Sequence, residues 1–377
     1  MNLSDDPDAA RFRRDLSAWL VDNLPTEPEP ATMPERYQFT LAWQRRLYAG
    51  GYGALSWPTE YGGAGRGPME EAILADELGA AKAPTVSSLS YLGRPLLEFG
   101  SEEQRRRYLP GFLSFEELWC QGFSEPNAGS DLASLRCRAV ERDGSYIISG
   151  QKIWTSYGTY ADYCLALVRT SNEGRKHEGI TAMIVPMSAP GVTVRPIKMA
   201  NGDEEFAEVF FDDVVVPLDA VLGGLGGGWR VAQSTLSYER GAIDIGYQAK
   251  FASYLAELTD AIVTSGDAID ERTRRSIASS AVALEVLRCH CLRSLGVRAS
   301  GEQQGARTSV DKLLMTLVEQ ELLSTSLEVL GPRAHLEPSP WFGRYVYARA
   351  GSIYGGSAQI QRNIIATRLL GLPRSDR

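Results

Sequence analysis

The spacing of hydrophobic residues changes twice along this chain. In the first third, apolar side chains recur every three or four positions, the period of an amphipathic helix. The segment 9–24 is typical, and the prolines between residues 25 and 30 end it. The same period predicts helices at 36–49, 69–81 and 91–99, and a charged segment at 102–108 then leads to Leu109 and Pro110.

Short runs with strand-like character fill the middle of the chain. Residues 135–140 and 146–152 flank Asp143-Gly144, a pair that favours a two-residue hairpin turn. Their spacing, with further strands predicted at 163–168, 180–185, 192–196 and 208–216, indicates a compact antiparallel sheet or barrel. The glycine-rich run 223–228 predicts a flexible link, after which the helical period returns to the end of the chain.

This order of periods predicts an α+β protein of several domains. With 377 residues the chain is too long for one compact core. We therefore expect an N-terminal helical domain at 1–118, a central β domain at 119–222 and a C-terminal helical bundle at 223–377.

Charge and cysteine content narrow the possible partners and location. The 47 acidic and 39 basic residues give a net charge of −8, which argues against nucleic acid and anionic membranes as partners. The acidic start of the chain is unlike a signal peptide, and the five cysteines are scattered, so we expect a soluble protein of the cytoplasm. The adjacent Cys289, His290 and Cys291 splay apart on a helix, which favours a core helix over a metal site.

Three motifs suggest chemistry. Residues 122–131 (GFSEPNAGSD) form a loop of small residues, hydroxyls and backbone donors that could hold a flavin edge and a pyrophosphate, although such loops are more often surface turns. Residues 150–156 (GQKIWTS) contain Trp154, and a tryptophan in a strand commonly packs in the core. Residues 353–362 (IYGGSAQIQR) have the small residues and apolar spacing of a helix start.

Together and in this order, the three motifs resemble those of the FAD-dependent acyl-CoA dehydrogenase family. Residues 208–217 (EVFFDDVVVP) and 370–374 (LGLPR) also resemble it, so the similarity covers essentially the whole chain and is weakest around 265–305. The resemblance implies an N-terminal helical domain, a central β-barrel-like domain and a C-terminal four-helix bundle, with FAD between the last two. It also implies a tetramer, either homotetramer or heterotetramer.

The resemblance also implies which residues contact the cofactor and the substrate. Trp154 would pack by the isoalloxazine ring and Ser156 would lie near its reactive nitrogen. The third motif would reach the FAD bound by a neighbouring subunit. The full set of expected FAD contacts is Gln121, Phe123, Ser124, Gly129, Ser130, Trp154, Thr155, Ser156, Gly356, Ser357 and Gln359; Ser130, Tyr238 and Arg240 are expected at the substrate.

Two departures from the family pattern lie near this expected site. Phe123 stands where the family usually has an aliphatic residue. Residues 327–332 (LEVLGP) lack the glutamine of the family's glycine motif, which contributes FAD contacts between subunits.

The expected catalytic base is Glu239. Many family members have their catalytic glutamate at the position of Gly355, and glycine cannot accept a proton. The branch that resembles isovaleryl-CoA and long-chain dehydrogenases instead uses a glutamate followed by arginine on another helix, as at Glu239 and Arg240. Glu239 falls at the edge of an apolar helical stripe, where burial would raise its pKa toward that of a useful base. A structural glutamate paired with an arginine is the alternative.

The implied reaction is α,β-dehydrogenation of an acyl-CoA or acyl-carrier thioester to the trans-2-enoyl thioester. Glu239 would remove the α-proton, and the Gly355 amide would bind the thioester carbonyl. Electrons would pass to an electron-transfer flavoprotein. The small residues Gly241, Ala242 and Gly355 favour a branched or cyclic acyl group. Two alternatives remain: a flavin monooxygenase on the same fold, and a non-catalytic subunit of a heteromeric dehydrogenase.

Overall fold

The chain forms two compact units, each built from segments that are distant in the sequence. The computed structural model describes residues 7–84, 90–238, 243–266, 268–302, 305–336 and 339–373. The sheet unit comprises Glu27–Gly65 and Pro84–Glu239, and the helical unit comprises Met1–Thr26, Arg66–Ala83 and Arg240–Arg377. Each unit is described by itself.

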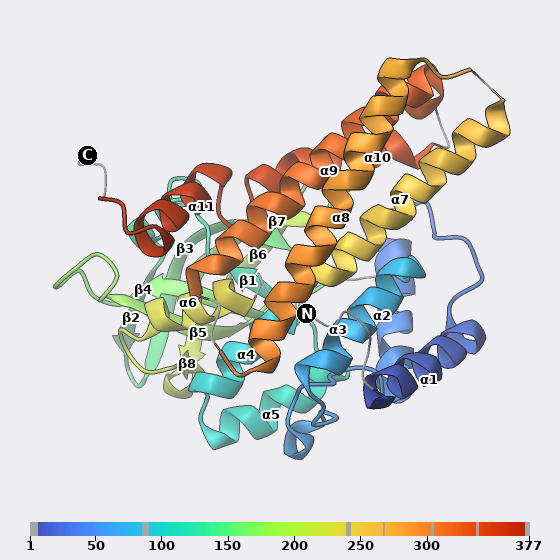
Figure 1. Cartoon of the computed structure of the whole chain (residues 1–377). Helices are drawn as coiled ribbons and strands as arrows, with labels where there is room; N and C mark the ends of the chain where they lie inside the picture. The colour runs from blue at the N-terminus through green and yellow to red at the C-terminus, as the bar shows by residue number, and fades with distance from the viewer. Residues whose placement is uncertain are drawn as a thin grey trace. The chain divides into compact units, whose positions relative to one another are not determined.

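The sheet unit contains an eight-stranded sheet in the order β6-β7-β3-β2-β4-β5-β8, with β1 also beside β4 (Figure 1). Both φ angles of the β2–β3 turn are positive, 52° at Asp143 and 77° at Gly144, as the hairpin prediction requires. β4 is parallel to β1 and β2, so the sheet is mixed rather than antiparallel. The strands are β1 Trp119–Gly122, β2 Arg138–Arg142, β3 Ser145–Ser156, β4 Tyr163–Arg169, β5 Ile180–Pro186, β6 Val192–Ile197, β7 Phe206–Pro217 and β8 Val221–Leu222.

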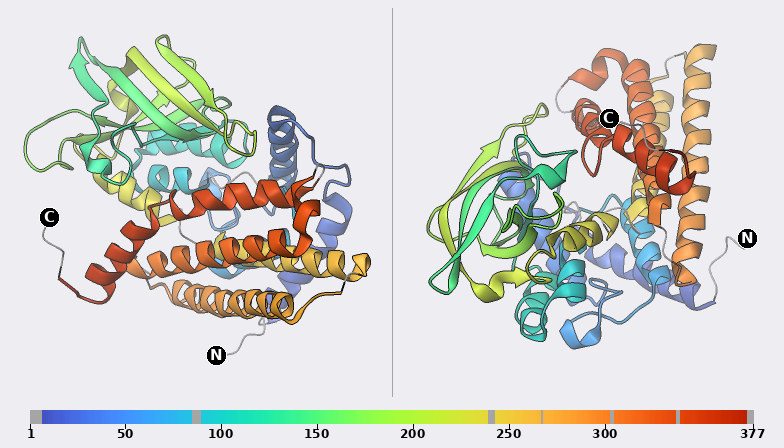
Figure 2. Two further views of the ribbon diagram at one scale, coloured as in Figure 1. Left: turned by 90° about the horizontal axis from the view of Figure 1, so that it is seen from above. Right: turned by 90° about the vertical axis from the view of Figure 1, so that its left-hand side faces the viewer.

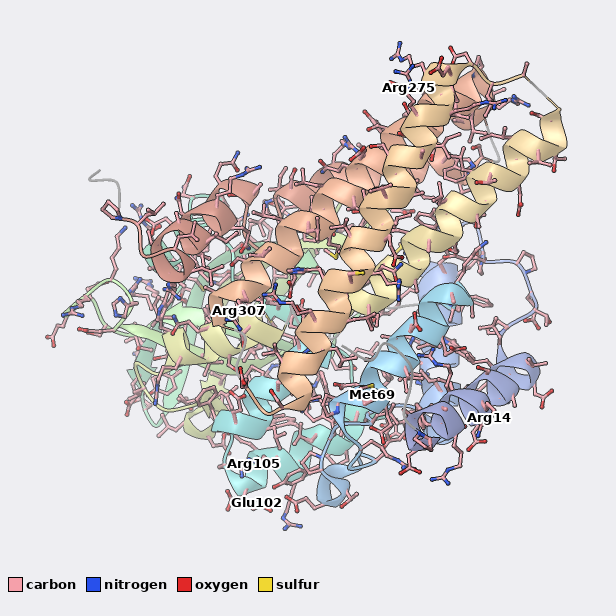
Figure 3. All side chains as sticks on the ribbon, in the orientation of Figure 1. Arg14, Met69, Glu102, Arg105, Arg275 and Arg307 are labelled. Atoms are coloured by element: carbon pink, nitrogen blue, oxygen red, sulfur yellow. The ribbon has the colours of Figure 1, made fainter. Side chains whose placement is uncertain are left out.

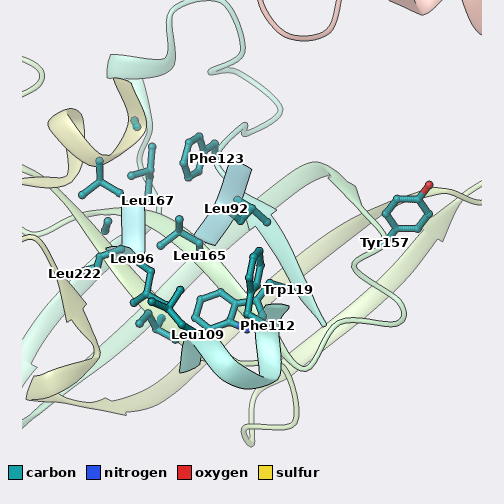
Figure 4. Packing of buried hydrophobic residues seen from close by; sticks show 14 of the residues in the cluster. Leu92, Leu96, Leu109, Phe112, Trp119, Phe123, Tyr157, Leu165, Leu167 and Leu222 are labelled. Carbon is teal, nitrogen blue, oxygen red and sulfur yellow. The ribbon is translucent and has the colours of Figure 1, made fainter. Parts of the chain in front are cut away.

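Helices of the sheet unit supply much of its main core. In Figure 4, Leu92, Leu96 and Leu109 pack with Trp119 and Leu165 of the strands, and all five are at most 2% exposed. The helices are α2 Met33–Ala49, α4 Ser90–Phe99, α5 Glu102–Leu113 and α6 Gly228–Tyr238, with short 3-10 turns at Thr59–Tyr61, Leu132–Ser134 and Leu218–Ala220. The charged segment is thus helical and continues past Pro110, because the apolar residues on both sides of the proline pack into this core.

The glycine-rich run before α6 is a tightly packed turn, so the prediction of a flexible link is wrong. Gly226 donates its N–H to the Thr181 hydroxyl at 3.0 Å. A Cβ added at Gly228 would lie 2.6 Å from the backbone of Thr181. The glycines are needed because two backbones meet here without room for side chains.

The helical unit is a bundle in which α7, α8 and α9 lie side by side (Figures 1 and 2). Phe251, Leu258, Leu287 and Leu322 are central to its core. In Figure 3, Arg275 lies in the first turns of α8 and Arg307 lies just before α9, toward opposite ends of this antiparallel pair. The helices are α1 Pro7–Asn23, α3 Pro68–Ala80, α7 Ile243–Ser265, α8 Glu271–Ala299, α9 Thr308–Leu330, α10 Pro340–Ala348 and α11 Ala358–Ile364, with short turns at Gly305–Arg307, Gly331–His335, Arg349–Ser352 and Ile365–Leu369.

Helices α3 and α7 approach each other at glycines. A Cβ added at Gly79 would lie 2.4 Å from the Gly246 carbonyl oxygen. Across the described part of the chain, no helix is long and apolar enough to cross a membrane.

Candidate flavin and thioester site

The first motif forms a loop of the sheet unit that follows β1 and is tied to β3. The Ile153 N–H donates to the Ser124 carbonyl at 3.0 Å. Glu125 and Ala128 exchange two backbone hydrogen bonds of 3.1 and 3.0 Å, which close the loop into a tight turn. Gly129 and Ser130, both expected at the cofactor, are exposed just beyond this turn.

A buried ion pair holds this loop in place. Lys152 on β3 is 0% exposed, and its ammonium donates to the Glu125 carboxylate at 2.8 Å and to the Phe123 carbonyl at 3.2 Å. The carboxylate also accepts the N–H groups of Arg136 and Cys137, at 2.6 and 2.8 Å. Both charged residues lie inside the first two motifs, yet the sequence analysis gave them no role. A charged residue on the inward face of a strand was the available signal.

Trp154 points away from the core, which excludes the alternative of simple core packing. The β3–β7 register shifts between Lys152 and Thr155, and Trp154 within this bulge has a φ of +60°. Its side chain is 57% exposed, and its ring meets that of Phe206 edge-on at 6.1 Å. The bulge therefore presents an indole at the surface of the sheet unit.

The neighbouring positions differ in what they can offer a ligand. Thr155 is fully buried, and its hydroxyl has no hydrogen-bond partner among the described residues. Gln121 and Ser156 are half-buried at strand ends. Phe123 is 3% exposed and belongs to the core, so only its backbone can face a ligand.

These residues fit FAD. An exposed indole suits stacking on an aromatic ring system, and the unpaired Thr155 hydroxyl lacks the partner that a flavin atom could supply. A Cβ at Gly129 would meet nothing within 4 Å, which leaves the loop backbone open to a ligand.

The third motif lies in the helical unit as a left-handed glycine turn before α11. Gly355 and Gly356 have φ angles of +61° and +90°. The Ser357 hydroxyl caps α11 by accepting the Ile360 N–H at 3.3 Å, and Gln359 is exposed in its first turn. A glutamate at position 355 would be strained by about 1–2 kcal/mol in this conformation, which agrees with the absence of a base there.

Two buried polar residues anchor this turn, and the sequence analysis did not single them out. The Lys312 ammonium on α9 donates to the Gly351 carbonyl and lies over the Tyr354 ring at 4.6 Å. Gln361 is 0% exposed, and its Nε2 donates to the carbonyls of Gly355 and Gly356 at 2.8 and 3.3 Å. A polar side chain on the buried face of a helix was again the only signal.

An unusual carboxylate lies near the same turn. Burial raises the pKa of Glu319 to about 7, and the positive charges of Lys250, Lys312 and Arg349 only partly oppose this. A Cβ added at Gly351 would lie 3.5 Å from the Glu319 Oε2. A half-buried carboxyl group with this pKa changes its charge close to neutral pH.

The expected base lies outside the described residues. Glu239 and Arg240 are not described, nor is the side chain of Tyr238 at the end of α6. Their roles therefore stay predictions.

The chain is similar throughout its length to known proteins. Profiles of the acyl-CoA dehydrogenase N-terminal, middle and C-terminal domains match residues 6–116, 120–214 and 226–370. Acyl-CoA dehydrogenase IpdE1 of Mycolicibacterium smegmatis is 37% identical over 387 residues, covering 96% of this chain and 97% of its own. Human mitochondrial short-chain specific acyl-CoA dehydrogenase is 28% identical over 362 residues, covering 92% of this chain and 87% of its own.

Solved structures are similar to this chain over its full length as well. The Tcur3481-Tcur3483 steroid ACAD superposes with a TM-score of 0.88 at 29% identity, and the ChsE4-ChsE5 complex from Mycobacterium tuberculosis with 0.85 at 30%. Both cover 100% of this chain and of their own. These relatives do not favour a monooxygenase or a non-catalytic role. With three domain profiles in order and full-length relatives of the same kind, the chain belongs to the acyl-CoA dehydrogenase family, whose FAD-dependent enzymes dehydrogenate acyl-CoA thioesters.

Proposed function

We propose that this acyl-CoA dehydrogenase uses Glu239 as its catalytic base and the Gly355 amide as the donor to the thioester carbonyl. The observation that carries the proposal is the left-handed glycine turn. Gly355 occupies the family's other base position with a φ of +61°, and no hydrogen bond joins its N–H to another described residue. The base must then come from another segment, and Glu239-Arg240 matches the branch of the family that has it there.

The chain's own residues would act on the α-carbon of the substrate. A hydrogen bond from the Gly355 N–H stabilises the charge that develops on the thioester oxygen, which acidifies the α-proton. Glu239 removes that proton. FAD, held by Ser130, Trp154 and Thr155 among others, supplies the chemistry that accepts the β-hydrogen as hydride.

The proposed substrate is the CoA thioester of a bulky ring acid. One full-length structural neighbour is named a steroid dehydrogenase. The small Gly355, together with Gly241 and Ala242 beyond the described residues, would leave room for such a group beside the α-carbon.

We further propose a tetramer containing a second, related chain, with an electron-transfer flavoprotein as acceptor. Two structural neighbours are named as assemblies of two proteins. A sister chain could supply the FAD contacts that residues 327–332 lack. The five free cysteines fit a reducing compartment, and the proposed location is the cytoplasm. The proposed domains are residues 1–118, 119–222 and 223–377.

The variant Glu239→Gln tests the base. It keeps the side chain's size and removes its basic lone pair, so FAD stays bound while anaerobic flavin reduction slows by roughly 10²–10⁴-fold. Stopped-flow absorbance measures this step, with CoA thioesters of a steroid-derived ring acid, isovalerate, octanoate and palmitate as substrates. Glu321→Gln, an exposed glutamate on α9, is the control and should reduce at the parent rate.

Three outcomes would contradict the proposal. Parent-like flavin reduction in Glu239→Gln would mean that Glu239 is structural. Turnover only with octanoate and palmitate thioesters would remove the ring-acid substrate. A homotetramer in native mass spectrometry, fully loaded with FAD and active without a partner, would exclude the need for a sister chain.

A further inference from the structure

Gln361 makes an uncommon pair of contacts with the glycine turn. Its Nε2 donates to two successive carbonyls, those of Gly355 at 2.8 Å and Gly356 at 3.3 Å. The side chain is 0% exposed. A Cβ added at Gly356 would lie 2.5 Å from the Gln361 Nε2, so the turn closes directly onto this amide.

These contacts fix the backbone of the turn on both sides of the Gly355 Cα–C bond. The peptide between Gly355 and Gly356 is planar and trans, so the Gly356 N–H points away from Gln361 when the Gly355 carbonyl points toward it. At the other end, the Gly351 carbonyl is held by Lys312 and by the Thr316 hydroxyl at 3.3 Å. The Gly355 N–H belongs to the Tyr354–Gly355 peptide between these two anchors, and it makes no hydrogen bond with a described residue. Its direction therefore depends on the anchors.

Packing alone would not hold the turn. A cavity of about 180 Å³ lies beside it, lined by Gly351, Gly356, Gln361, Lys312 and Thr316 among others. The turn has space to move on this side if the amide contact is lost. The Gln361 Oε1 is buried without a partner among the described residues, so the amide orientation is set by the two carbonyls it serves.

We propose that Gln361 is a positioning residue for the dehydrogenation: by holding the carbonyls of Gly355 and Gly356 it fixes the backbone of Gly355, so that the N–H of the preceding Tyr354–Gly355 peptide faces the thioester carbonyl. This rests on the proposed role of that N–H. Gln361 does not touch the substrate. It acts through the backbone of Gly355, whose N–H does, and a misplacement of such a donor by about 1 Å can cost 10²-fold in rate.

The experiment compares two glutamines that bind backbone carbonyls. Gln361→Met keeps the side chain's length and removes the donor. The control Gln320→Met removes a hydrogen bond of the same length, 2.8 Å to the Ala348 carbonyl, at the end of α10 rather than in the turn. Both variants should lower the Tm by a similar amount, roughly 2–4 °C. Two further measurements then distinguish the two variants. The first is hydrogen–deuterium exchange of the FAD-loaded protein. The second is the rate of anaerobic flavin reduction with the thioester that reduces the parent fastest.

For Gln361→Met we expect faster amide exchange confined to residues 351–358, retained FAD and flavin reduction slowed by roughly 10–100-fold. Gln320→Met should keep parent exchange in that segment and the parent rate. If Gln361→Met does not fold, Gln361→Asn keeps the amide but shortens its reach and should show the same pattern in weaker form.

Parent-like reduction in a folded Gln361 variant, or equal slowing in Gln320→Met, would overturn the positioning role. A parent enzyme that no acyl-CoA thioester reduces would instead overturn the proposed function. In that case the exchange data would still report whether Gln361 orders the turn.

Discussion

The variant Lys152→Met is expected to destabilise the sheet unit strongly and to weaken FAD binding. It keeps the stem of the side chain and removes the buried ammonium from the Glu125 carboxylate and the Phe123 carbonyl. Removing one partner of a buried pair costs roughly 3–5 kcal/mol, because the other charge stays behind unpaired. We expect the lower end, about 3 kcal/mol, since the carboxylate keeps the N–H groups of Arg136 and Cys137.

Urea unfolding followed by tryptophan fluorescence measures the loss, and flavin fluorescence measures the affinity for FAD. Lys176→Met is the control, because its exposed ion pair with Asp131, at 2.7 Å, belongs to the same loop and should contribute at most about 1 kcal/mol. The double change Lys152→Met with Glu125→Gln removes both charges of this buried pair and should recover part of the stability. The reasoning fails if Lys152→Met costs no more than the control, or if the double variant is no more stable than Lys152→Met.

Three further variants test burial and packing in the helical unit. Between pH 4.5 and 7 the folded state holds a proton on Glu319 that the unfolded state has lost, so the free energy of unfolding falls as pH rises through this window. Glu319→Gln should remove this pH dependence and stabilise the protein at pH 8 by up to roughly 3 kcal/mol. Urea unfolding at several pH values measures the effect, and an unchanged pH dependence in the variant would refute the role of Glu319. Gly79→Ala should cost about 1–3 kcal/mol because its Cβ would lie 2.4 Å from the Gly246 carbonyl. Gly296→Ala, where a Cβ on α8 meets nothing within 4 Å, should gain up to about 1 kcal/mol, and equal effects of the two on Tm would contradict this.

The contrast between prediction and structure follows from the range of the interactions. The helices starting near residues 9, 36, 69 and 91 and the Asp143-Gly144 hairpin could be predicted, because helical periodicity and turn chemistry act over a few neighbouring residues. The same local information did not decide the structure of the charged segment at 102–108. A proline such as Pro110 commonly ends a helix, but packing of Leu109, Phe112 and Leu113 continues this one to Leu113.

The glycines before α6 show the same limit. Flexible links and tight backbone crossings have similar composition, and only the contact between Gly226 and Thr181, 45 residues apart, distinguishes them. Trp154 is a second case. A tryptophan in a strand commonly packs in the core, whereas a bulge against β7 turns this one outward. Neither outcome is encoded within one segment.

The motifs of the candidate site could be identified in the sequence, because each is a short contiguous segment. The residues that hold these motif loops in position could not be predicted from the sequence. Lys152 and Glu125 are 27 residues apart, and Lys312 reaches Gly351 across 39. A buried polar residue tells from sequence that it needs a partner, but not which one, because its partner is chosen by how distant segments pack. Local periodicity and turn chemistry therefore determined the element types and the motif loops, while tertiary packing decided which charges and amides hold those loops in position.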